Sequence, residues 1–139
     1  MLHREDKGMF LNQLSNEEKN AFISLSVKIA ESNGSFDESE KEMIQEYCKE
    51  MGIPFFDAEK ALNMEKITEV FKESTDHIKR IVILESLGVA YSDGRLDPEE
   101  EELMNSFASK IGIGESRYEE IVELLNKYLV VLAELTEKI

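Results

Sequence analysis

The chain has 139 residues, of which 30 are acidic and 16 basic, and its formal net charge is -14. A charge of that sign repels nucleic-acid phosphates and anionic lipid headgroups, so cations and basic protein surfaces are the expected partners. No stretch approaches the ~18 consecutive apolar residues of a membrane span. We therefore expect one domain over residues 1–139 that is cytoplasmic, binds no nucleic acid and does not insert into a membrane.

The sequence repeats itself at an offset of 60 residues, which brings Gly34 onto Gly94. The apolar positions recur in phase with the identical ones, without a gap. The offset predicts two copies of one helix-loop-helix unit, over about 15–53 and about 75–113. The recurring residues are Ala30, Ser32, Gly34, Asp37, Glu40, Gly52 and Ile53, which return as Ala90, Ser92, Gly94, Asp97, Glu100, Gly112 and Ile113.

The first copy predicts two helices. Ser15 followed three residues later by Glu18 is a capping box, which marks the start of the first helix. The second helix opens at Asp37 and is closed by Gly52. Cys48 lies in its apolar stripe and has no second cysteine to pair with, so we interpret it as a small core residue.

The rest of the chain is also helical in pattern. Residues 55–74 predict one or two short helices, with Asp57 and Asn63 as caps. The second copy begins near Thr75 or Asp76 with a helix that is apolar on several sides, as expected of a central helix covered twice. The last helix, 116–137, should be long and deeply packed, although its broad apolar stripe could also support a homodimer. Together these elements predict an all-α fold, a compact bundle of about seven helices with an internal duplication.

The loop inside each copy can be explained as a structural device. A glycine ends the preceding helix in the left-handed conformation. Asp37 and Asp97 would then cap the next helix. Glu40 and Glu100, three residues later, would return a hydrogen bond to the backbone of the cap.

The same loops could instead hold a hard cation such as calcium or magnesium, for which carboxylate and carbonyl oxygens are the usual ligands. Asp93 is the one member of this set that no helix cap requires, and Asn33 replaces it in the first copy, so the second loop is the better candidate. The loops are not ordinary EF-hands, because the first and third ligand positions fall on Val89 and Tyr91. The candidate metal ligands are Asp93, Asp97 and Glu100 in the second copy and Asn33, Asp37 and Glu40 in the first.

This pattern resembles the tellurite-resistance TerB-like family. The resemblance rests on a helix that ends in Ala-x-Ser-Asn/Asp-Gly, an Asp-x-x-Glu helix start and a Gly-Ile stop, all of which occur twice. It covers about residues 10–135. It implies a compact all-helical fold with internal pseudo-twofold symmetry, found in bacterial tellurite and stress resistance systems and in the membrane-proximal domain of a J-domain cochaperone. It also implies acidic clusters that chelate metal at the loops, and surfaces that bind partners.

Nothing in the sequence has the pattern of an active site. His3 and His77 lack a second histidine or a cysteine at ligand spacing, and no phosphate-binding loop or nucleophile motif is present. The leading hypothesis is therefore a non-enzymatic TerB-like module of bacterial stress or tellurite resistance, whose acidic loops could bind a divalent cation. The alternative is a protein-interaction or cochaperone-like scaffold in which the acids only cap helices.

Overall fold

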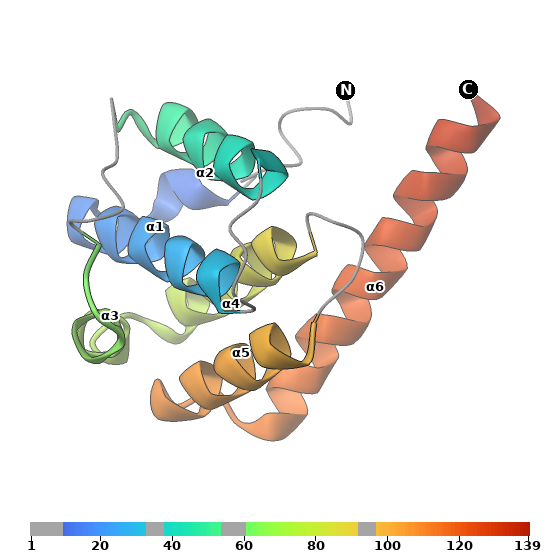
Figure 1. Cartoon of the computed structure of the whole chain (residues 1–139). Coiled ribbons are helices and arrows are strands. Elements are labelled where there is room, and N and C mark those ends of the chain that lie inside the picture. Colours follow the sequence, from blue (N-terminus) through green and yellow to red (C-terminus); the bar gives the residue numbers. More distant parts are fainter. Residues whose placement is uncertain (1–9, 33–37, 54–60, 92–96) are drawn as a thin grey trace.

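The computed structural model describes residues 10–32, 38–53, 61–91 and 97–139 (Figure 1). The described residues form helices and no strands, which confirms the all-α class. Six α-helices and one short 3-10 helix lie within these ranges, close to the predicted seven. They are η2 (Leu11–Gln13), α1 (Asn16–Glu31), α2 (Glu38–Met51), α3 (Met64–Lys72), α4 (Asp76–Ala90), α5 (Pro98–Lys110) and α6 (Glu115–Lys138).

Helices begin at residues whose side chains can accept hydrogen bonds from the free backbone N–H groups of the first turn. Ser15 and Glu18 form the predicted capping box at α1. The side chains of Asn63 and Thr75 accept the backbone N–H groups at the starts of α3 and α4. These caps confirm three predicted helix starts, while the predicted cap Asp57 lies outside the described residues.

Two helix ends show the same closing motif. Gly52 and Gly112 have φ angles of 76° and 91°, a left-handed conformation that costs glycine little. The next residue then folds back: the N–H of Ile53 donates to the carbonyl of Cys48 at 2.8 Å, and that of Ile113 to Ala108 at 2.9 Å. Both ends therefore stop as predicted, 60 residues apart in sequence. An internal duplication at an offset of 60 residues requires this spacing, and the duplication itself stays a prediction.

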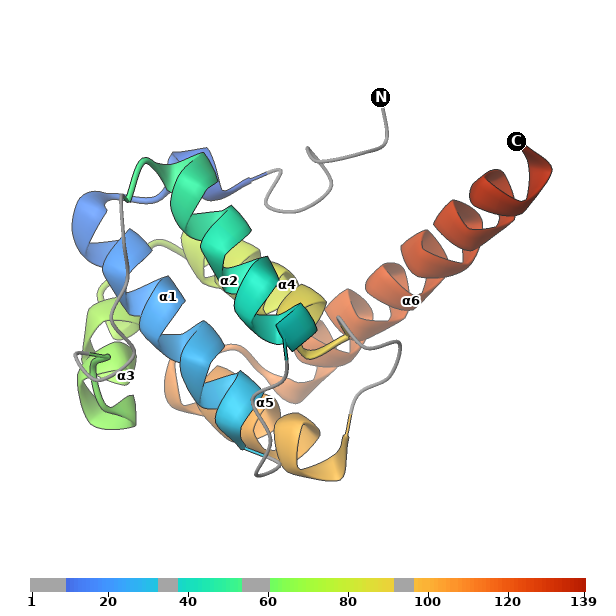
Figure 2. The ribbon, with the colours of Figure 1, turned by 45° about the horizontal axis from the view of Figure 1, so that its top comes forward.

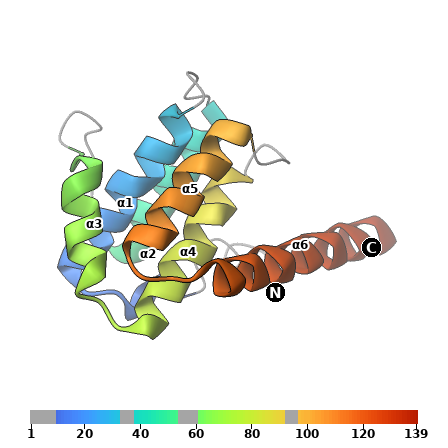
Figure 3. The ribbon, with the colours of Figure 1, turned by 90° about the horizontal axis from the view of Figure 1, so that it is seen from below.

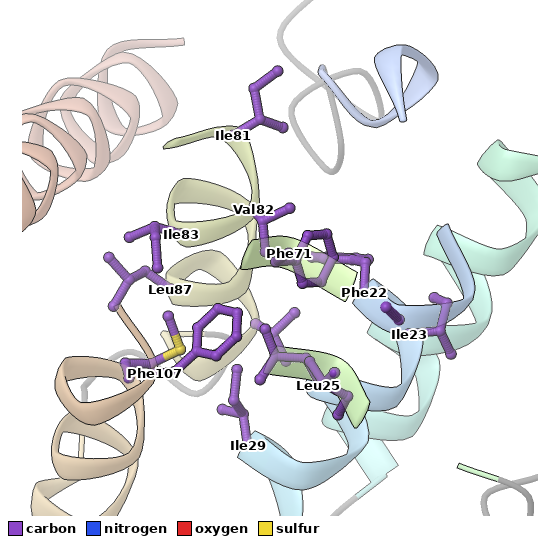
Figure 4. Close-up of a cluster of buried hydrophobic side chains, with 14 of the residues drawn as sticks. Phe22, Ile23, Leu25, Ile29, Phe71, Ile81, Val82, Ile83, Leu87 and Phe107 are labelled. Carbon is purple, nitrogen blue, oxygen red and sulfur yellow. The ribbon is translucent and has the colours of Figure 1, made fainter. Parts of the chain in front are cut away.

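Helices α1 and α4 form the centre of the molecule and pack against each other. Phe22 and Leu25 of α1 and Leu87 of α4 are fully buried between the surrounding helices (Figure 4). The edge-to-face pair of Phe71 and Phe107, with ring centroids 6.1 Å apart, joins α3 to α5 beside this contact. The prediction that the first helix of the second copy is central and covered on several sides is confirmed, because α1, α5 and α6 all pack on α4.

Helix α2 lies alongside α1 (Figure 2) and also packs on α4 and η2. Its buried face includes Tyr47, whose ring meets that of Phe22 edge to face at 5.2 Å between centroids. Cys48 is buried, as expected of a core residue, and burial raises the pKa of its thiol.

Helix α6 has the predicted length but is only half packed. Its first half lies on α4 and α5, where Tyr118, Ile121 and Leu125 are buried. Its second half extends beyond the other helices (Figures 1 and 3), and Val131 and Leu135 there are 54% and 42% exposed. The prediction that this helix is deeply packed holds as far as Leu129 and is wrong for the last turns, which extend past the body.

No helix among the described residues is long and apolar enough to cross a membrane.

One carboxyl group is buried among the apolar helices. Glu85 of α4 is 6% exposed, and its Oε2 accepts the N–H of Phe10 at 3.1 Å, which ties the segment before η2 to the core. Burial raises the pKa of Glu85 from 4.5 to about 7, with a further contribution from the charge of Glu50, while the bond from Phe10 opposes the shift. The group therefore favours its neutral form in the folded state.

This shift predicts a pH-dependent stability. In the unfolded chain Glu85 ionises near its ordinary pKa of 4.5, whereas in the folded chain it keeps its proton until about pH 7. The penalty on folding therefore grows from pH 4.5 to 7 and is fully present above pH 7. Glu85→Gln retains an acceptor for Phe10, so we expect a gain of up to about 3 kcal/mol at pH 8 and little change at pH 4.

Urea unfolding at a series of pH values measures this difference, with the exposed Glu42→Gln as the control. An equal gain at pH 4 and pH 8 would contradict the buried-carboxyl explanation.

Candidate functional site

Asp97 and Glu100, two of the predicted ligands, meet at the start of α5 in a capping box. The backbone N–H of Asp97 donates to Oε1 of Glu100 at 3.1 Å, and the Asp97 side chain accepts the N–H of the third helical residue. Pro98 occupies the first helical turn, where its missing N–H costs nothing. The interpretation of this loop as a helix cap is therefore confirmed at Asp97 and Glu100.

Glu100 and its counterpart Glu40 are buried although both are acidic. They are 1% and 2% exposed, each in the first turn of its helix, α5 or α2. The positive end of a helix dipole favours a carboxylate at that place. In α5 the neighbouring Glu99 and Glu101 add negative charge at the same end, so the start of α5 is the most acidic helix start that the structure describes.

The other predicted ligands, Asn33, Asp37 and Asp93, lie outside the described residues. Within the described ranges no group of three or more histidine, cysteine, aspartate or glutamate side chains is arranged to hold a metal ion. The structure thus brings together Asp97 and Glu100 of the predicted ligands.

His77 has a structural contact. Its Nε2 lies 2.8 Å from Oε1 of Gln13, so the ring links the start of α4 to η2. Tyr118 of α6 buries its hydroxyl without a hydrogen-bond partner among the described residues, and burial, with Glu101 and Tyr91 nearby, raises its pKa to about 12. Neither arrangement supplies an acid-base pair.

Two features were missed in the sequence. The first is Glu85, whose signal was a lone acid within the apolar run of α4, between Leu84 and the buried Ser86. The second is the largely exposed apolar stripe along α6 from Leu124 to Leu135. Its residues were all recognised as apolar, but their exposure depends on where the body of the protein ends. We define the α6 stripe as the exposed Leu124, Val131 and Leu135 together with the partly buried Tyr128 between them.

Comparison with known proteins identifies a family and no individual relative. Residues 55–123 match the family model described as tellurite resistance protein TerB. The match spans α3, α4, α5 and the packed beginning of α6, and it ends one residue before the α6 stripe begins at Leu124. No curated protein and no solved structure matches the chain. The segment containing the Asp97–Glu100 helix start is thus the part that the family model recognises, and by it the chain belongs to the TerB-like family.

Proposed function

We propose that this protein is a non-enzymatic TerB-like interaction module that acts in bacterial tellurite or stress resistance. The observation that supports an interaction role is the exposed apolar face that runs along α6 from Leu124 to Leu135. Leu124, Val131 and Leu135 are 63%, 54% and 42% exposed and follow one another at helical spacing.

A continuous apolar face on a charged protein points to a binding surface. Isolated exposed leucines are common, but a row of them along one helix face is typical of a protein contact. These side chains are already about half covered, so burying the rest of each would stabilise a complex by roughly 1 kcal/mol, before the cost of association. The link to tellurite or stress resistance comes from the family description alone.

Site-specific photo-crosslinking tests this proposal. A photoreactive amino acid at Val131 lies within the stripe, whereas one at the exposed Ala133, two residues along the helix, points to the opposite side. In bacterial cells that express the full chain, we expect a discrete crosslinked product from position 131 and none from position 133. No product at position 131, or equal products from both positions, would contradict an interaction role for this face.

A second candidate function, cation binding at the loop before α5, is favoured by the acidic start of that helix. The cap of Asp97 and Glu100 gathers two carboxylates there, and Glu99 and Glu101 flank them. Asp93 would contribute a third ligand if the loop holds calcium or magnesium.

Asp97→Ala separates the cap from a cation site. As a cap alone, Asp97 should contribute about 1 kcal/mol to the free energy of unfolding, in calcium, in magnesium and in a chelator alike. Thr75→Ala, which removes the cap of α4, is the matched control. A loss of stability that appears only with the cation, together with calorimetric binding abolished by Asp97→Asn with Glu100→Gln, would establish the cation site and overturn the interpretation as a cap alone.

A further inference from the structure

We propose that the α6 stripe binds a second copy of this chain, and that the two helices pair antiparallel. The inference rests on the proposed interaction function and names its partner. It concerns the part of α6 that lies beyond the family match and whose last turns project from the body (Figure 3).

The spacing of the stripe fits a helix pair. Leu124, Tyr128, Val131 and Leu135 are separated by steps of four, three and four residues, the alternation of a two-helix seam. The seam runs over residues 124–135, about 18 Å of helix. Leu132, which is half-buried, widens the stripe on one flank.

The charges of the segment permit self-association although the whole chain carries a net charge of -14. Residues 124–139 contain two lysines and two glutamates, whose charges cancel. Two copies can therefore meet at this end of α6 with much less repulsion than at the acidic helix starts. A segment with balanced charges also offers no excess charge to select the basic partner that the whole chain would attract.

The flanking charges select the antiparallel orientation. Lys127 and Glu134 each precede a stripe residue by one position, so both lie on the same flank, seven residues apart. When two such helices run antiparallel, like flanks meet in reverse order, and Lys127 of each copy faces Glu134 of the other. Among the described residues neither side chain forms an ion pair within its own chain.

The apolar layers agree with that register. With Lys127 opposite the second copy's Glu134, Leu124 packs against Leu135 and Tyr128 against Val131. A parallel pair would bring the charged flank against the flank of Leu132, where neither charge meets its opposite. The antiparallel pair is also closed by a twofold axis, so it predicts a dimer and no larger assembly.

Sedimentation equilibrium of the purified full chain tests the dimer. The wild type should be a monomer in dilute solution and a dimer at high concentration, because the contact is small. Glu134→Lys makes the net charge less negative, so if only overall charge repulsion mattered, the two copies would associate more strongly. The antiparallel register predicts weaker association instead, because the introduced lysine of each copy would face Lys127 of the other. We expect the dimer dissociation constant to rise about 5–10-fold.

The matched control is Glu137→Lys, which makes the same change of charge on the side of α6 away from the stripe. It should leave the dimer unweakened. Lys127→Glu should weaken the dimer as Glu134→Lys does, and the double exchange Lys127→Glu with Glu134→Lys should restore it to within about 2-fold of the wild type.

Three results would overturn the proposal: a wild type that stays monomeric up to millimolar concentration, equal effects of Glu134→Lys and Glu137→Lys, or a double exchange that fails to restore the dimer. A monomeric wild type combined with a photo-crosslink from position 131 to a different protein would refute the dimer and leave the interaction function standing. Absence of both would refute the two together.

Discussion

The contact between α1 and α4 is the constraint on which the rest of the structure depends. Both helices are apolar around most of their circumference, so neither can lie at a surface without exposing a large area to water. Their mutual contact covers one side of each, and α2, α3, α5 and the first half of α6 cover the others. The outer helices accordingly need only one apolar face each, and α6 needs it for half of its length.

Many of the acidic residues lie at helix starts, where the packed helices can accommodate their negative charge. Acids stand in first helical turns, as at α1, α2 and α5, while lysine occupies the last turns of α1, α2, α3, α5 and α6. Each sign thus lies at the helix end whose dipole favours it. Glu85 departs from this arrangement, and its raised pKa is the consequence of placing a carboxyl within the apolar core around α1 and α4.

Local chemistry could be predicted from the sequence because it is set by neighbours along the chain. Capping boxes at Ser15 and Asp97 and the glycine stops at Gly52 and Gly112 each depend on residues within about one turn, and all four are confirmed. The family resemblance rested on the same local motifs, and residues 55–123 bear it out.

Features set by distant parts of the chain could not be predicted in this way. Whether Val131 is buried depends on how far the body reaches along α6, and no local pattern encodes that distance. The partner of Glu85 is Phe10, 75 residues away. An acid within an apolar run is visible in the sequence, but the hydrogen bond that accounts for its burial is not. The metal hypothesis shares this difficulty, because Asp97 and Glu100 have the same sequence pattern whether they only cap a helix or also bind a cation.

The central claim is that the α1–α4 contact carries the fold, while the end of α6, from Val131 on, takes no part in it. Amide hydrogen exchange of the dilute full chain tests this claim most directly. Amides in the middle of α1 and α4 should exchange only through global unfolding, and those of residues 131–138 should exchange far faster. Equal protection of the end of α6 and of α4 under those conditions would contradict the account.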